Sequence, residues 1–359
     1  MVIDLGKRLV DLVFEFDNVV KYVFNYNRTL FKINCRKSIS NVMSSNRYIK
    51  MCRGIILRNS DKKIIEYPFD KFYNDFEEPR SIDPLFLTQD TQVTEKLDGV
   101  LIIPYKHEGK LKFSTRGSFS NRFTEMAEQV ATFDDLPTEK YTFMFELISP
   151  DFLNFLVTKY EKTELRLIGL RSKEDWSLLM PNEMKKVAEN LDLKTCEIYD
   201  DLTMSDIIIK KHEIGCDREG WVVYSKVNGR VNMMKVKRPE YFKMFKVKKS
   251  CGTEHGLKKI VVDNMLKDNA IIKGVPDVFH ETAYEISDYV RSVYYNVERK
   301  LEKMYLDYLC DRKSRKEYFV RLDALAIDKT YKRLLKLYYL CDERKLFVEI
   351  LKMIGDGKL

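Results

Sequence analysis

Three hydrophobic patterns follow one another along the chain. Between residues 5 and 24, apolar residues recur at helical spacing, which predicts an amphipathic opening helix. From about residue 50 to 250, short apolar runs alternate with charged residues, glycine and proline, which is typical of strands. The predicted strands are 54–57, 92–95, 100–105, 111–114, 142–147, 165–170, 220–224 and 231–236. Helices are expected between them at 121–132 and 181–191, the second beginning with Pro181.

The third pattern begins near residue 250 and is helical. One apolar stripe comprises Ile286, Tyr289, Val290, Val293, Val297, Leu301, Met304 and Tyr308. Two more helices are predicted around 334–338 and 346–354. We therefore expect an α+β fold, with an antiparallel-rich domain over 1–249 that includes the N-terminal helix. An all-α domain over 250–359 follows it.

Composition limits the class of protein. The 359 residues are 45% hydrophobic, which is ample for packed cores. No run of eighteen apolar residues and no secretory signal pattern is present, so a cytoplasmic location is expected, the host cytoplasm if the protein is viral. The seven cysteines are scattered without C-x-x-C spacing, which argues against a disulfide framework and structural zinc.

The net charge of +8 suits a polyanionic partner, and its placement says more than its size. Between Lys235 and Lys249 seven basic residues lie among Met, Val, Tyr and Phe, a mixture suited to phosphates beside stacking surfaces. A solvated basic strand and turn would explain the same stretch equally well. Beyond residue 250, acidic and basic residues nearly balance.

The most informative segment is Lys96-Leu97-Asp98-Gly99, which joins two apolar runs. A lysine attacks phosphorus only as the free amine, and burial beside other cations lowers its pKa enough for that. We therefore expect a nucleophilic Lys96 with a lowered pKa. The competing interpretation is a β-hairpin whose turn is Asp98-Gly99.

Several segments around it carry cations at strand ends. Arg53 begins an apolar strand, where a guanidinium can bind a phosphate in bidentate fashion. Lys71 precedes Phe72 and Tyr73, and Arg116 stands beside a glycine that lets backbone approach a ligand. Lys235 and Lys237 would point to one face of a strand and stabilise charge on phosphate oxygens. Surface arginines, core aromatics, turns and solvated strands are the ordinary alternatives.

Two carboxylates stand at apolar strands. Glu146 lies inside the run 143–148, where an acid is costly unless it is partnered, bound to a ribose hydroxyl or near a metal. Glu219 follows Asp217-Arg218 and precedes Gly220, and it could hold metal-bound waters. A simple hairpin entry would explain the second segment.

Taken in order, these segments resemble the motif series of the covalent nucleotidyltransferases, which comprise polynucleotide ligases and RNA-capping enzymes. The flanks resemble the phage-type RNA ligase 1 family of tRNA-repair ligases more closely. They are Cys52-Arg53-Gly54-Ile55, Phe69-Asp70-Lys71-Phe72-Tyr73-Asn74, Phe145-Glu146-Leu147-Ile148-Ser149-Pro150 and Lys235-Val236-Lys237 with Tyr241. Two positions depart from that family: Arg116 stands where lysine is usual, and Asn154-Phe155 replaces an Asn followed by a basic or polar residue.

The resemblance implies an antiparallel-rich nucleotidyltransferase (ATP-grasp-like ligase) domain and a role for each matching residue. Lys96 would carry the covalent AMP, assisted by Lys235 and Lys237 as the other catalytic residues. The nucleotide site would comprise Arg53, Lys71, Tyr73, Glu95, Lys96, Gly99, Arg116, Glu146, Gly220, Lys235, Lys237 and Tyr241. Asp98, Glu146 and Glu219 would hold a hydrated magnesium, with manganese as the alternative ion.

The implied function is an ATP-dependent RNA ligase that joins 5′-phosphate and 3′-hydroxyl RNA ends through lysyl-AMP and RNA-adenylate. The implied partners are ATP and RNA ends, such as those of broken tRNA, with an end-healing kinase or phosphatase acting upstream. The helical domain would be an RNA-specificity module. Two alternatives stay open: another lysyl-nucleotidyltransferase, either a capping guanylyltransferase or a DNA ligase, and a non-catalytic RNA-binding protein on the same fold.

Overall fold

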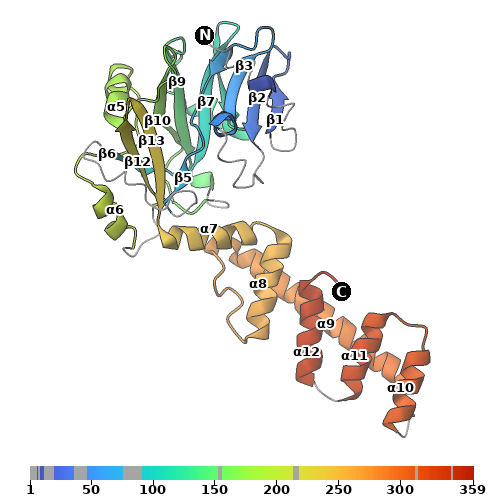
Figure 1. Ribbon diagram of the computed structural model, residues 1–359. Coiled ribbons are helices and arrows are strands. Elements are labelled where there is room, and N and C mark those ends of the chain that lie inside the picture. The colour runs from blue at the N-terminus through green and yellow to red at the C-terminus, as the bar shows by residue number, and fades with distance from the viewer. Residues whose placement is uncertain are drawn as a thin grey trace. The chain divides into compact units, whose positions relative to one another are not determined.

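The structure is a computed structural model (Figure 1). It describes residues 6, 9–11, 20–35, 47–75, 91–152, 156–212, 218–311, 314–340 and 343–359. The chain forms two compact units, Met1–Met244 and Phe245–Leu359, and the division falls within helix α7 (Pro239–Cys251). Each unit has hydrophobic clusters of its own.

The first sheet of unit 1 is antiparallel, in the order β1-β2-β3-β4. Its strands are β1 (Val20–Phe24), β2 (Leu30–Cys35), β3 (Arg53–Arg58) and β4 (Ile64–Glu66), with the short helix α3 (Arg47–Met51) before β3. Our prediction of a helix over 5–24 is wrong at its C-terminal end, because β1 pairs along its whole length with β2. Valines at 20 and 23 fit a pleated strand as well as a helical stripe.

The second sheet is also antiparallel, in the order β10-β9-β7-β8. It contains β7 (Val100–His107), β8 (Lys110–Thr115), β9 (Tyr141–Ile148) and β10 (Glu164–Ser172). Asn121 caps the N-terminus of helix α4 (Arg122–Val130), and its side chain accepts hydrogen bonds from the backbone N–H groups of Phe123 and Thr124. One face of this sheet packs with α4 and with α5 (Pro181–Asn190) around a core that includes Phe143, Leu167 and Met184.

The third sheet carries the Lys96 segment, in the order β11-β6-β12-β13-β5. Its strands are β5 (Tyr73–Asn74), β6 (Thr91–Lys96), β11 (Ile198–Tyr199), β12 (Gly220–Val227) and β13 (Arg230–Lys237). Only the pairing of β5 with β13 is parallel among these described strands. Helix α6 (Met204–Lys210) packs on the face that bears Val93 and Val223. The strands and both helices predicted for 50–250 are confirmed.

Unit 2 is helical, as predicted. It contains α8 (Glu254–Leu266), η3 (Asp277–Phe279), α9 (His280–Tyr308), α10 (Arg315–Ala324), α11 (Lys329–Tyr339) and α12 (Glu343–Gly355). The predicted α9 stripe is confirmed at Val290, Val297 and Leu301, which are buried. Tyr289 and Tyr308 were assigned to the same stripe wrongly, since they are 53% and 46% exposed. The α+β class with a helical C-terminal part is therefore confirmed.

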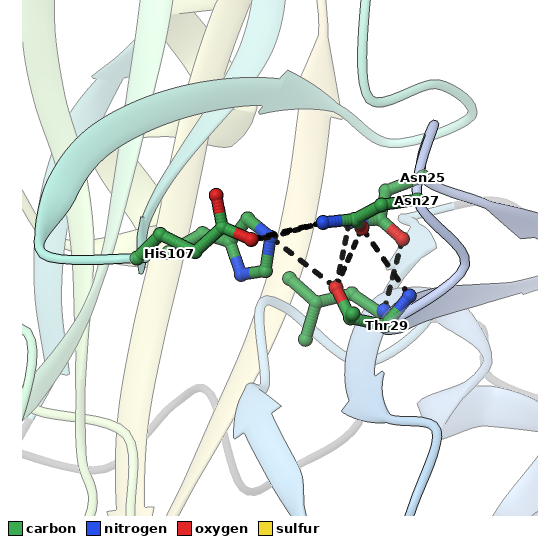
Figure 2. A network of polar contacts seen from close by, with 6 residues as sticks. Asn25, Asn27, Thr29 and His107 are labelled. Carbon is green, nitrogen blue, oxygen red and sulfur yellow. Dashed lines mark hydrogen bonds and ion pairs between the residues drawn. The ribbon is translucent and has the colours of Figure 1, made fainter.

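A polar cluster joins the first two sheets at their edge (Figure 2). The Thr29 hydroxyl donates to Asn27 Oδ1 over 2.7 Å and lies 3.2 Å from His107 Nε2. Asn27 Nδ2 also donates to Glu108 Oε1 over 2.9 Å. The exposed turn between β1 and β2 is thus held against the end of β7. Within the described ranges, no helix is long and apolar enough to cross a membrane.

Candidate active site

The pairing of β6, β12 and β13 places two of the predicted catalytic lysines in one row. Gly220 on the middle strand is the register partner of both Lys96 and Lys237. A Cβ on Gly220 would lie 2.1 Å from the Val236 carbonyl oxygen, and the backbone has a φ of +146°, so a side chain would not fit. Lys235 is two residues before Lys237 and points to the same face.

Glu219 bridges the two lysines of this row. Its Oε2 lies 2.7 Å from Lys96 Nζ, and its Oε1 lies 2.6 Å from Lys237 Nζ. The Glu219 side chain is 4% exposed, which makes the bridge a buried one. Burial raises the pKa of Glu219, but Lys96 and Lys237 outweigh it, and the resulting pKa is lowered. Glu219 is therefore a carboxylate.

The expected lowering of the Lys96 pKa is contradicted. Burial lowers this pKa, but the carboxylates of Glu219, Glu146 and Asp98 together raise it above its ordinary value. The lowered pKa belongs to Lys235, at about 7, because of burial and of the charges of Lys96, Lys237 and Arg53. The cations do converge as predicted. The three acids that raise the pKa are the ones that the resemblance assigned to the metal, and the prediction does not include their effect on Lys96.

Asp98 of the K-x-D-G motif is tied into the surrounding structure. Its Oδ2 accepts from the backbone N–H groups of Val157 (2.8 Å) and Thr158 (3.0 Å). Its Oδ1 accepts the Tyr241 hydroxyl at 2.7 Å, and its backbone N–H donates to the Tyr160 hydroxyl at 2.8 Å. Asp98 therefore links the nucleophile segment to the loop after η2 (Pro150–Phe152) and to the start of α7.

Glu146 lies under the turn of the motif. A Cβ on Gly99 would come within 2.8 Å of Glu146 Cγ and 2.4 Å of the Leu147 carbonyl oxygen, so the turn requires glycine. The Gly99 N–H hydrogen bonds to the Glu146 carboxylate. Burial, with added repulsion from Glu219 and Asp98, raises the pKa of Glu146 to about 8. The charge of Lys96 counteracts this rise, because a nearby cation favours the ionised carboxylate.

The first and second sheets meet where Arg53 and Arg116 stand. Gly54 follows Arg53 in β3 and has a φ of +98°. A Cβ on Gly54 would lie 3.0 Å from both the Cα and the carbonyl oxygen of Arg116. The close approach therefore explains the Arg-Gly pair at the start of β3 and sets Arg116 beside that strand.

The aromatic segment after Pro68 lies against β13. Tyr73 pairs with Met234, and Lys71 Nζ lies 4.6 Å from the centre of the Tyr73 ring. Lys235 Nζ lies 4.2 Å from the Phe72 ring, a contact that the sequence did not predict. Tyr73 thus belongs to the strand next to β13, and Lys71 lies two residues before that strand residue.

Glu95 stands apart from this group. Because neighbouring side chains of a strand alternate, Glu95 and Lys96 leave β6 on opposite faces. Glu95 lines a hollow of about 410 Å³ together with Arg166, Arg218 and Glu197. Burial raises its pKa, while Arg218 and Arg166 counteract it. A role for Glu95 in nucleotide binding stays a prediction.

Sequence reasoning missed two further groups. Lys32 of β2 is 1% exposed and reaches the turn that carries Arg116; Tyr160 holds the Asp98 backbone. Neither lies in a recognisable motif, so no signal in the sequence pointed to them. Asn154-Phe155 and Asp217 lie outside the described residues.

The donor set has the chemistry for a hydrated divalent cation. Asp98, Glu146 and Glu219 act on one another's charge. Burial is the main cause of the raised pKa of Glu146, and a cation would relieve the repulsion from Glu219 and Asp98 that adds to it. Among the residues that the structure describes, no group of three His, Cys, Asp or Glu side chains is arranged to hold a metal directly. Magnesium commonly keeps several waters and takes its other ligands from phosphates.

Residues 51–251, more than half of the chain, match the family model described as RNA ligase. The chain belongs to this RNA ligase family. The resemblance inferred from the motifs is thereby confirmed, and the matched range contains the lysine row, its bridging carboxylate and the Arg116 turn.

Known members of the family resemble part of the chain. The RNA ligase of Rhodothermus phage RM378 is 29% identical over 35% of this chain and 38% of its own length. RNA ligase 1 of bacteriophage TS2126 is 28% identical over 36% of each. The chain thus spans little more than a third of these curated relatives. A solved archaeal ATP-dependent RNA ligase shares the fold, with a TM-score of 0.50 at 14% identity over 95% of this chain and 99% of that one.

Proposed function

We propose that this protein is an ATP-dependent RNA ligase that acts through a covalent lysyl-AMP at Lys96. The observation that carries the proposal is the row formed by Lys96, Gly220 and Lys237, with Lys235 on the same face and Glu219 between the two outer lysines. A nucleophilic amine with two further cations on one strand face suits attack on a nucleotide phosphate. Membership of the RNA ligase family supports the substrate class.

In the first step the Lys96 nitrogen forms a bond to the α-phosphorus of ATP, the bond from that phosphorus to the bridging oxygen breaks, and pyrophosphate leaves. The Lys96 proton goes to solvent before attack. Lys235 and Lys237 stabilise the negative charge on the phosphate oxygens. AMP then passes to an RNA 5′-phosphate, and an RNA 3′-hydroxyl displaces it, which closes the strand.

The raised pKa of Lys96 makes loss of its proton the demanding part of the first step. Asp98, Glu146 and Glu219 would hold a hydrated magnesium or manganese ion, and such an ion supplies positive charge that lowers the pKa of the amine. Arg53, Lys71 and Arg116 would contact phosphates and sugar. Tyr73 and Tyr241 would border the nucleotide.

Unit 2 is proposed to select the RNA. The groove between α11 and α12 has a volume of about 520 Å³. Five basic residues and one acid border it, namely Arg333, Lys336, Arg344, Lys345, Lys352 and Glu349, and Glu349 pairs with Arg333 over 2.7 Å. Basic side chains along a groove neutralise phosphates without reading bases, which suits recognition of a folded RNA by shape. Broken tRNA with a 5′-phosphate and a 3′-hydroxyl fits this description.

The direct test is incubation with ATP labelled at the α-phosphate and a divalent cation. We expect a covalent label on the wild-type protein and none on Lys96→Ala. Lys62→Ala, which changes a lysine in the turn between β3 and β4, is the matched control and keeps the label. Labelled GTP and nicked DNA separate a ligase for RNA from a capping enzyme and a DNA ligase. A wild-type protein that seals RNA ends without taking the label would overturn the scheme.

A further inference from the structure

Lys32 is an unusual core residue. It is 1% exposed and ranks among the largest fully buried side chains of the described residues. Burying an ammonium group costs more free energy than burying a hydrocarbon side chain of similar size. Burial accordingly lowers the pKa of Lys32 well below its ordinary value. Polar groups in a neighbouring segment should therefore explain why a lysine occupies this position on β2.

The neighbour is the turn 115–118. Lys32 Nζ donates to the Thr115 carbonyl oxygen and lies 3.5 Å from the Ser118 carbonyl oxygen. The Ser118 carbonyl also accepts the Thr115 N–H at 3.0 Å, so Lys32 Nζ joins the two ends of the turn. The centre of the Phe119 ring lies 5.0 Å from the same nitrogen.

The turn itself carries Arg116. From the opposite side, Asn121 Nδ2 donates to the Thr115 hydroxyl at 3.1 Å. The middle of the turn presses on β3, since a Cβ on Gly54 would lie 3.0 Å from the Arg116 Cα. The Arg116 backbone is thus fixed by Lys32 at its ends and by Gly54 at its centre.

We propose that Lys32 is a positioning residue, whose buried Nζ fixes the turn 115–118 so that Arg116 faces the nucleotide held by Lys96. This rests on the proposed function, because Arg116 is assigned to the nucleotide there. A positioning role is a reason to retain a lysine in the core. An apolar residue on β2 would suit the core but would leave the Thr115 and Ser118 carbonyls without this donor.

A double-mutant cycle tests the proposal. Lys32→Met keeps an unbranched side chain, one atom shorter, and removes the donor. We expect the rate of Lys96 adenylylation at subsaturating ATP to fall about tenfold in Lys32→Met, a transition-state loss of about 1.4 kcal/mol. In an Arg116→Ala background the same substitution should change the rate less than about twofold. Lys62→Met is the matched control, because Lys62 also donates to a backbone carbonyl and lies over the ring of Phe31, yet stands in the turn between β3 and β4.

Equal losses in both backgrounds would overturn the proposal, since Lys32 would then act independently of Arg116. If Lys32→Met does not fold, Lys32→Gln enters the same cycle, because its amide keeps two donors without the charge. Amide hydrogen exchange gives a readout that needs no activity: the amides of 115–118 should exchange faster in Lys32→Met than in Lys62→Met. If exchange at 115–118 is unchanged, Lys32 does not fix the turn, whether or not the protein forms lysyl-AMP. If exchange is faster but no lysyl-AMP forms, only the proposed function is rejected.

Discussion

The two units of the protein bury different kinds of side chain. Unit 1 buries seven charged residues within the described ranges, namely Lys32, Glu66, Asp75, Asp98, Glu164, Arg171 and Glu219. The core of unit 2 is built from aliphatic and aromatic residues such as Val290, Leu334 and Ile350, and among its described residues only Lys248 is both charged and buried. Buried ion pairs contribute little net stability, whereas apolar burial contributes about 25 cal/mol per Å².

The difference teaches where each unit keeps its function. The charges of unit 1 cost free energy when buried. Asp98 and Glu219 act on Lys96, and Lys32 holds the Arg116 turn, so we assign these three to chemistry and to positioning. The other four form ion pairs elsewhere in the unit. Unit 2 has a core that any stable helical scaffold would share, and its candidate function lies on an outer groove. Substitution of a buried charge in unit 1 should therefore reduce both activity and stability, whereas substitution of a core residue in unit 2 should reduce stability without changing adenylylation.

Glu219→Gln should have the largest effect. It leaves Lys96 and Lys237 buried without their shared counter-charge, and we expect unit 1 to lose about 3–5 kcal/mol. The rate of adenylylation should fall about a hundredfold or more, because the Lys96 and Lys237 side chains would lose the carboxylate that bridges and orients them. Denaturant unfolding and the α-phosphate label measure the two losses. Glu349→Gln is the control in unit 2, where the partner Arg333 is 65% exposed, and its cost should stay below about 1 kcal/mol.

Leu334→Ala should reverse the pattern. Leu334 is fully buried in unit 2, and loss of its side chain should cost about 2–5 kcal/mol of stability. Adenylylation of Lys96 should be unchanged below the melting temperature of unit 2. Leu340→Ala is the control, since Leu340 is 47% exposed and should alter stability by less than about 0.5 kcal/mol. Loss of the covalent label in Leu334→Ala would show that the two units do not act separately.

Charge reversal in the groove of unit 2 should affect RNA without affecting ATP. Arg344→Glu combined with Lys352→Glu should weaken binding of a nicked tRNA about tenfold at low salt and flatten its dependence on salt concentration. The amount of lysyl-AMP should match the wild type. Lys303→Glu on α9 serves as the surface control. An equal loss with the control and the groove variant would locate the RNA elsewhere.

The pH dependence of ATP binding should be the mildest effect. The pKa of Lys235 is about 7 in the folded protein, so its charge is lost as the pH rises through 7. Affinity for an α,β-methylene analogue of ATP should therefore fall severalfold from pH 7 to 9, with proton uptake on binding. Calorimetry in two buffers of different ionisation enthalpy measures both. Lys235→Arg, which stays charged, should flatten the profile.

The same shift has a consequence for stability. Between about pH 7 and the ordinary lysine pKa, the unfolded chain holds a proton on Lys235 that the folded protein does not, so Lys235 makes stability rise with pH there. Glu66 acts in the opposite direction: burial raises its pKa to about 7, and its contribution is lost as the pH rises from 4.5 to 7.

Local pattern predicted most of the strands, because the alternation of apolar and polar residues and the turn residues between strands occupy consecutive positions in the sequence. The roles of the site residues came from the family resemblance and stay predictions. The error at Val20–Phe24 arose because valines satisfy both periods, and the pairing with β2 decides between them. The sign of the Lys96 pKa shift depends on Glu219, which is 123 residues away in sequence. The role of Lys32 could not be predicted for the same reason, because its acceptors are 83 and 86 residues away in sequence.

The bridge between Lys96, Glu219 and Lys237 also affects how Lys96 reacts with electrophiles other than ATP. An amine that is 18% exposed and kept as an ammonium by acidic neighbours is a poor target for aldehydes, cyanate and activated esters. Without nucleotide, Lys96 would therefore react slowly with such reagents, and surface lysines would be modified first. Binding of the triphosphate and its cation would therefore decide when the Lys96 amine becomes reactive.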